Sequence, residues 1–218
     1  MKKLRKIIYL IFIKLKKIID KFSMKLFHIK TILQEVDFVN EISPENNGLD
    51  PKKVKRCTHS NTPYLKKTLK LLRISKNDSI LDIGCSKGAA LLCMHEFPFR
   101  KIHGIEISDN LVHIANNNFL RLRKKNIGIT NIDALDFKDY KEYNIFYIYN
   151  SLFPQDLKKV LEIILNSNKN RDIFFIYNNP RYAYVFEDFP IYLIKNLLGN
   201  WEHRIYLYSN VESPIRFN

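Results

Sequence analysis

One glycine-containing turn holds the residues whose types and spacing point most directly to chemistry. In the stretch ILDIGCSKGAA an apolar run ends in Asp82, and Gly84 and Gly88 follow it. These are two of only six glycines in the chain. Glycine lets a backbone adopt positive φ and approach a ligand closely, and the N–H groups that open a following helix can bind a carboxylate. We therefore predict a ligand-binding turn that also includes Cys85 and Ser86.

The same turn can be fitted loosely to a dinucleotide fingerprint, G-x-G-x-x-G/A, through Gly84, Ser86 and Ala89. Three features argue against that fit. Serine replaces the central glycine, Gly88 has no role in the fingerprint, and Asp82 stands where nicotinamide-binding domains have an apolar or small residue. A nicotinamide-dependent oxidoreductase is kept as an alternative.

Two further acids follow later apolar runs. Glu106 ends the run Gly-Ile-Glu and can accept both hydroxyls of a ribose, or it is a solvated residue at a strand end. Asp133, followed by Ala134, can accept a hydrogen bond from the exocyclic amine of an adenine. The alternative for Asp133 is that it caps a short following helix.

A polar side chain also ends a fourth apolar run, where Asn150 lies between Tyr149 and Phe153. An amide oxygen can hold an amine with its lone pair aimed at a reacting carbon, and positioning supplies much of the rate of such a displacement. Aromatic faces attract cations. The alternative is that Asn150 only makes the turn into the next helix.

Strands and helices alternate around these residues from residue 79 onward. The predicted strands cover 79–83, 101–107, 128–131, 143–149, 172–177 and 203–208, with a short seventh at 214–217. The predicted helices cover 63–72, 88–97, 110–124, 155–165 and 192–198. Such alternation indicates βαβ units. It predicts an α/β fold with a Rossmann-like, doubly wound, mainly parallel sheet.

In this order and spacing, the four stretches resemble the class I S-adenosylmethionine-dependent methyltransferases. Asp82, Gly84 and Gly88 match the family pattern D-x-G-x-G-x-G, and Ser86 departs from its middle glycine. The resemblance implies S-adenosyl-L-methionine as the cofactor and a seven-stranded sheet whose last strand is antiparallel. It also implies cofactor binding by the turn residues already named and by a further set, which is Glu106, Asp133 and Ala134.

A closer resemblance is to a group of little-characterised bacterial members with YNPF-like and YxNP-like motifs. The chain shows YNSLF at 149–153 and YNNP at 177–180. The first stretch is also similar to the N-P-P-Y motif of amino methyltransferases, without its prolines. The resemblance implies Asn150 and Tyr149 as catalytic residues, and Tyr64, Phe153 and Asn178 as acceptor-binding walls.

The methyl acceptor is not identified by these motifs. They favour an amine or a hydroxyl group as the acceptor, on a small molecule, a glycan or a protein. Because serine replaces a motif glycine, a catalytically weak S-adenosylmethionine-binding module, tethered to a membrane or a partner, is a second alternative.

The net charge of +14 is concentrated at the N-terminus, where residues 1–30 hold ten lysines and arginines against one acid. Apolar residues recur there at helical spacing, which predicts a basic amphipathic helix. No apolar run approaches the ~20 residues that span a bilayer. We expect residues 1–30 to bind an anionic membrane surface; the alternative is a stripe packed on the catalytic core or in a dimer. Charge gathered in one segment argues against a nucleic-acid partner.

The cysteines and the distribution of turn residues complete the sequence predictions. Three cysteines without CxxC spacing predict neither a disulfide framework nor a metal site. They favour a reducing, cytoplasmic compartment, with peripheral attachment at the inner face of the membrane. We predict a helical segment over 1–40, a connector over 41–60 and a methyltransferase domain over 61–218.

Overall fold

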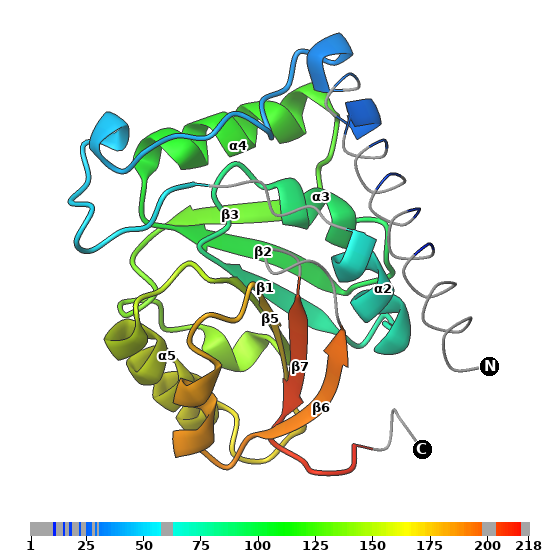
Figure 1. Ribbon diagram of the computed structural model, residues 1–218, viewed down its shortest axis with the longest axis vertical. Helices are drawn as coiled ribbons and strands as arrows, with labels where there is room; N and C mark the ends of the chain where they lie inside the picture. Colours follow the sequence, from blue (N-terminus) through cyan, green and yellow to red (C-terminus); the bar gives the residue numbers. More distant parts are fainter. Residues whose placement is uncertain are drawn as a thin grey trace.

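The structure, a computed structural model, describes residues 31–57, 63–197 and 204–214, with eight residues of the preceding helix. One seven-stranded sheet runs in the order β3-β2-β1-β4-β5-β7-β6 (Figure 1). The strands are β1 (Ser79–Ile83), β2 (Lys101–Glu106), β3 (Ile127–Asn131), β4 (Ile145–Tyr149), β5 (Phe174–Asn178), β6 (Tyr192–Leu197) and β7 (Ile205–Ser209). The strands from β1 to β5 pair in parallel, and β7 pairs antiparallel with both β5 and β6. This confirms the predicted Rossmann-like sheet.

Helices cover both faces of the sheet (Figure 1). One face carries α2 (Pro63–Leu71), α3 (Ala89–Met94) and α4 (Asp109–Arg121), and the other carries α5 (Pro154–Ser167) with the 3-10 segments η2 (Tyr140–Glu142) and η3 (Ala183–Asp188). Strand β1 is buried along its whole length. Its successive residues Ile80 and Leu81 enter the two different apolar clusters, as expected for a strand buried on both faces.

The parallel strands bring the predicted site residues to one edge of the sheet. Parallel strands end at the same edge, and ligands of open α/β sheets bind there. Glu106 is the last residue of β2, and Asn150 directly follows β4. The turn after β1 therefore faces both of them, although they are distant in sequence.

A helix was predicted over 192–198, but residues 192–197 form the strand β6, so that prediction was wrong. Leu193, Ile194 and Leu197 have helix-like spacing, but only Leu197 is buried. β6 pairs antiparallel with β7 at the edge of the sheet, with a register shift between Leu193 and Lys195. Pairing of an edge strand overrode the local pattern. Of the strand predicted at 214–217, Pro214 is not in a strand and the rest lies outside the described residues.

The segment 36–57 does more than connect two parts of the chain. It runs along α4 and reaches the edge where the parallel strands end (blue to cyan in Figure 1). Lys87, in the glycine turn, is fully buried and pairs with Asp37, and its Nζ also donates to the Asn40 carbonyl at 2.8 Å. Asn118 of α4 exchanges two hydrogen bonds with the Asp37 backbone, each of 2.9 Å. These contacts fasten the segment to the turn.

We predict that Lys87→Met destabilises the protein by about 3 kcal/mol, because it leaves a partly buried Asp37 carboxylate without its cation. The exposed pair Lys66–Glu96 supplies the control, since Lys66→Met should cost less than about 1 kcal/mol. Urea unfolding of both variants measures the difference. Equal losses in the two variants would show that the buried pair does not fasten the segment.

Candidate active site

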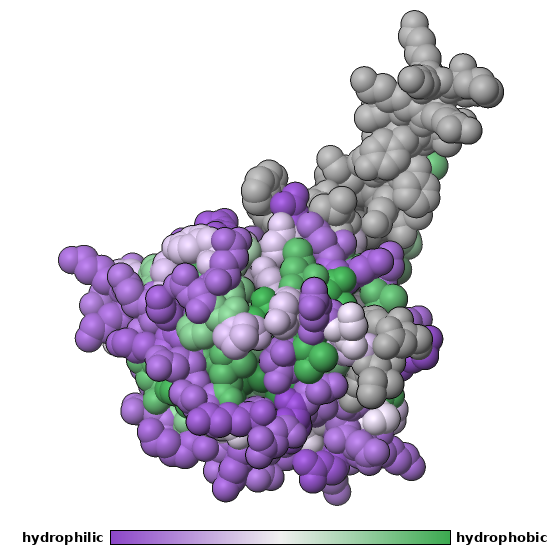
Figure 2. Space-filling view, turned by 90° about the horizontal axis from the view of Figure 1, so that it is seen from below, coloured by the Kyte–Doolittle hydropathy of each residue, from purple (hydrophilic) through white to green (hydrophobic). Residues whose placement is uncertain are grey.

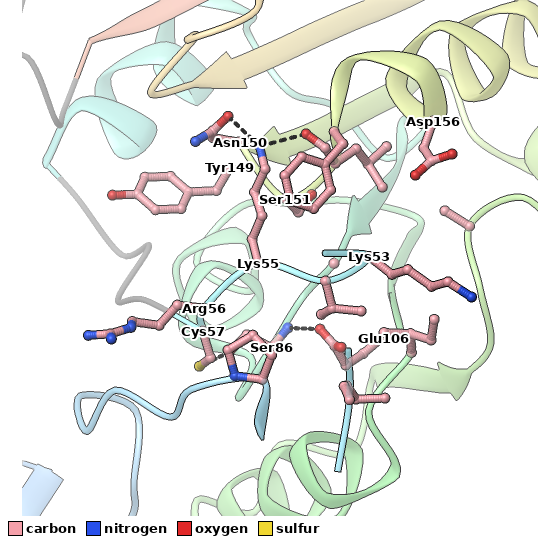
Figure 3. Close-up of a pocket in the computed structure, with 18 of the residues that line it drawn as sticks. Lys53, Lys55, Arg56, Cys57, Ser86, Glu106, Tyr149, Asn150, Ser151 and Asp156 are labelled. Atoms are coloured by element: carbon pink, nitrogen blue, oxygen red, sulfur yellow. Dashed lines mark hydrogen bonds between the residues drawn. The ribbon is translucent and has the colours of Figure 1, made fainter. Parts of the chain in front are cut away.

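A cavity of about 550 Å³ lies at the carboxyl ends of β1, β2 and β4, under the segment 44–57. Among the residues that line it are several of the predicted site residues: Gly84, Ser86, Glu106, Asp133, Ala134, Tyr149, Asn150 and Phe153. Figure 3 shows side chains from the segment and from the strand ends pointing toward one another across this space. The structure thus brings five of the eight expected cofactor residues into one cavity with Tyr149, Asn150 and Phe153 of the expected acceptor side.

Gly84 is required at its position for two physical reasons. Its φ is +76°, a conformation that side chains with a Cβ rarely adopt. A Cβ built on Gly84 would also lie 2.5 Å from the Cβ of Ser151. The Ser151 hydroxyl donates to the Ile83 carbonyl at 2.6 Å, which holds the two loops in contact. The turn after β1 and the loop after β4 are therefore pressed together.

Ser86, which stands at the middle glycine of the family pattern, has a φ of +51°. The left-handed region costs a non-glycine residue about 1–2 kcal/mol. The Ser86 N–H donates to Glu106 at 2.9 Å, and its hydroxyl contacts the thiol of Cys57. Serine is thus accommodated in the conformation that the missing glycine favours.

Two predicted residues of the turn serve its packing and do not line the cavity. A Cβ on Gly88 would lie 2.5 Å from the Phe119 ring, so glycine there lets α3 pack against α4. The Cys85 thiol is buried against Gly104, and burial raises its pKa well above the ordinary range. The Cys85 N–H donates to the Ile105 carbonyl at 3.0 Å, which ties the turn to β2.

Glu106 presents a buried carboxylate to the cavity and is only 6% exposed. One oxygen accepts the N–H of Ser86 at 2.9 Å, and the other accepts the N–H of Ser108 at 3.0 Å. Burial raises the pKa of Glu106, and these backbone hydrogen bonds oppose the rise. A third backbone N–H, that of Ile107, also bonds to this carboxylate. A carboxylate has about four lone-pair positions, so Glu106 can still accept a hydrogen bond from a ribose hydroxyl.

Asp82 lies behind the turn and is 2% exposed. Its Oδ2 has no hydrogen-bond partner among the described residues. Burial raises its pKa well above the ordinary value, and the charge of Glu106 adds to the rise. A buried polar oxygen without a partner is costly. Asp82 does not line the cavity, so this oxygen lies behind the turn and not on the surface that a cofactor would touch. The fit to a cofactor rests instead on Glu106, whose buried carboxylate does line the cavity.

Asp133 makes the capping contact that its sequence allowed, and its position leaves the adenine-binding role a prediction. Its Oδ1 accepts the N–H of Leu135 at 2.9 Å, so it caps the following turn. It also lines the cavity beside Ala134.

The structure places Tyr64 and Asn178 away from the cavity lining. Tyr64 packs in the apolar core beneath α2. Asn178 is fully buried in β5, where its amide donates to the Tyr147 hydroxyl at 2.9 Å. The cavity is lined instead by Arg181 and Tyr182, a few residues further along the chain. The predicted motif was therefore near the site, but its asparagine side chain faces the core.

Sequence reasoning missed Lys55, which enters the cavity from the covering segment (Figure 3). Its Nζ donates to the Asn150 Oδ1 at 3.0 Å and to the Leu152 carbonyl at 2.7 Å. Nothing in the sequence distinguishes it from its neighbours Lys52, Lys53 and Arg56. Only the tertiary structure brings it to a residue 95 positions away.

Comparison with known proteins agrees with this geometry. Residues 76–161 match the model of a family described as "Putative methyltransferase". A curated relative, ribosomal RNA small subunit methyltransferase A of Prochlorococcus marinus (strain MIT 9215), is 28% identical over 120 residues. That alignment covers 52% of this chain and 44% of the relative, so the chain spans less than half of the relative's length.

Solved structures show the same fold. An RNA methyltransferase from Salinibacter ruber in complex with S-adenosyl-L-homocysteine gives a TM-score of 0.53 at 16% identity, covering 71% of this chain and 95% of that one. A SAM dependent methyltransferase from Aquifex aeolicus gives a TM-score of 0.55 at 15% identity, covering 67% and 89%. These two likenesses show the fold, and the family match places the likeness to methyltransferases in residues 76–161, which hold the glycine turn and the ends of β2 and β4. Because relatives include RNA methyltransferases, the prediction against a nucleic-acid partner is not confirmed.

The left-handed conformation of Ser86 yields a stability prediction. Ser86→Gly should stabilise the fold by about 0.5–1 kcal/mol, because relief of the backbone strain exceeds the extra entropy of glycine in the unfolded chain. Urea unfolding measures the change. Ser86→Ala is the control: it removes the hydroxyl but keeps the strained Cβ, and should bring no gain. A stabilisation shared by both variants would assign the effect to the hydroxyl and contradict the argument.

Proposed function

We propose that this protein transfers a methyl group from S-adenosyl-L-methionine to an amine that enters over Asn150. The observation that supports this proposal is the single cavity in which the glycine turn and Glu106 face Asn150 and Phe153. Ser151 contributes to it, because its contact with Gly84 holds the two halves of the cavity together.

The chain's own residues have distinct parts in holding the cofactor. Gly84 and Ser86 form the backbone cradle at the end of β1, and Asp82 is buried behind them. Glu106 would accept the ribose hydroxyls, and Asp133 with Ala134 would meet the adenine. When bound, the cofactor supplies an electrophilic methyl group on a sulfonium.

On the acceptor side, catalysis rests on orientation. The Asn150 Oδ1 and the Leu152 carbonyl are both hydrogen-bond acceptors, and they suit the two N–H groups of an amine better than a hydroxyl with a single donor. Phe153 and Tyr149 border the same space and offer aromatic faces to a cation. Correct placement of a nucleophile can by itself supply a large part of a rate enhancement.

The alternatives from the sequence receive less support. The matched relatives are methyltransferases, which favours methyl transfer over nicotinamide-dependent oxidation. Ser86 adopts the backbone conformation expected of the glycine it replaces, which weakens the case for a binding module without turnover.

Calorimetric titration with S-adenosylhomocysteine tests the proposal. We expect Glu106→Gln to weaken binding by at least about tenfold, because charge-assisted hydrogen bonds to the ribose are lost. Glu162→Gln, an exposed acid on α5, is the matched control and should bind like the parent.

Methyl transfer from labelled S-adenosylmethionine to a panel of amines completes this test. Absence of S-adenosylhomocysteine binding, equal binding by the two variants, or binding of NAD instead would overturn the assignment.

We also propose that the N-terminal helical residues attach the protein to an anionic membrane surface. Among the described residues no helix combines the length and apolarity needed to cross a bilayer. Phe27 of this segment packs against Phe38 of the core, whereas six other described apolar side chains are 45–64% exposed. They are Ile11, Leu15, Ile18, Phe22, Leu26 and Ile29. Apolar surface shows in green to the right in Figure 2. The ten cations of residues 1–30 complement an anionic surface.

Vesicle sedimentation tests this attachment. Phe22→Asp should weaken binding to phosphatidylserine-containing vesicles by at least about tenfold, because an apolar anchor is lost. Leu120→Asp, at a leucine of α4 that is even more exposed than Phe22, should have little effect. Equal binding to purely zwitterionic vesicles would contradict attachment to an anionic surface. A dimer that Phe22→Asp dissociates would show that the exposed stripe binds a second copy of the chain.

A further inference from the structure

Lys55 occupies the part of the cavity where an acceptor amine would lie. Its Nζ donates hydrogen bonds to the Asn150 Oδ1 at 3.0 Å and to the Leu152 carbonyl at 2.7 Å (Figure 3). Lys55 lines the same cavity as Gly84 and Ser86 of the glycine turn. The chain thus places one of its own primary amines against the two acceptors that we assign to the acceptor subsite.

Two aromatic rings complete the surroundings of this amine. The Lys55 Nζ lies 4.2 Å from the centroid of the Tyr182 ring and 5.0 Å from that of Phe153. Such faces attract an ammonium group, and they attract its methylated form as well. The site can therefore hold both the substrate and the product of amine methylation.

The hydrogen bonds also orient the nitrogen. A neutral primary amine has two N–H donors and one lone pair. When Asn150 and Leu152 each accept one hydrogen, the lone pair points away from both of them. Asn150 has a φ of +45°, and the neighbouring Ser151 touches the glycine turn, so the acceptors are fixed beside the cofactor end of the cavity.

The neutral form of this amine is accessible at ordinary pH. Burial lowers the pKa of Lys55 to about 8, with a smaller contribution from the positive charge of Arg181. About half of the Lys55 side chains are then neutral near pH 8, whereas an unperturbed lysine is almost fully protonated there.

We propose that Lys55 is itself a methylation site of this protein, modified in cis by the activity proposed above, on which this inference rests. The neutral Nζ forms a bond to the methyl carbon while the bond from that carbon to the sulfonium sulfur breaks. The bonding electrons stay on sulfur, which leaves as S-adenosylhomocysteine. The methylated ammonium releases one proton to water or remains charged between the aromatic rings.

Peptide mass spectrometry of the full chain, incubated with S-adenosylmethionine that carries a CD3 group, tests this proposal. We expect CD3 on Lys55 well before it is found on the exposed neighbour Lys52. The first-order rate should not depend on protein concentration, because the reaction is intramolecular. The rate should rise with pH, reach half of its maximum near pH 8 and level off about one pH unit higher, as Lys55 loses its proton.

Two variants sharpen the test. Asn150→Gly suits the left-handed backbone, removes one of the two acceptors and should slow Lys55 labelling by at least about tenfold. Lys52→Arg should leave the labelling of Lys55 unchanged.

Titration of the same samples with S-adenosylhomocysteine separates the two claims. Binding without label on Lys55, or label spread evenly over exposed lysines, overturns this inference alone. Failure to bind overturns the proposed function and this inference with it.

Discussion

The site depends on one close approach, between the turn after β1 and the loop after β4. No side chain fits between Gly84 and Ser151, and the Ser151 hydroxyl is bonded to the last carbonyl of β1 at 2.6 Å. Any Cβ on Gly84 would force these loops apart. Because they touch, the residues suited to a nucleotide cofactor and those suited to an amine share one cavity. Methyl transfer needs that proximity more than it needs an acid or a base.

The segment 36–57 closes the cavity and contributes Lys55, a primary amine, to its lining. The buried Lys87 holds the segment to the glycine turn through Asp37. Lys55 of the same segment donates a hydrogen bond to Asn150 across the cavity. Ser86 and Asn150, at the two sides of the cavity, both have positive φ. Strained residues of this kind persist where the surrounding structure holds them in place, and they gather at functional sites. Both strained turns therefore lie where the covering segment closes the cavity.

Much of the fold and of the cofactor side could be predicted from the sequence, because parallel strands deliver whatever follows them to a common edge. Glu106, Asp133 and Asn150 come together for that reason. Lys55 could not be predicted, since its role comes from a contact across 95 residues. Asn178 was wrongly predicted to face the acceptor, because a motif does not show whether a side chain at the end of a strand points into the core or into the cavity. The strand β6 was missed because this exposed edge strand lacks the continuous apolar run that marks the buried strands.

The most direct test of the shared cavity is an experimental structure of the protein with S-adenosylhomocysteine bound. The account predicts the ribose hydroxyls on the Glu106 carboxylate and the sulfur atom facing the Lys55 Nζ, with no side chain between them. A ligand held away from Glu106, or a sulfur separated from Asn150 and Lys55 by another part of the chain, would contradict the account.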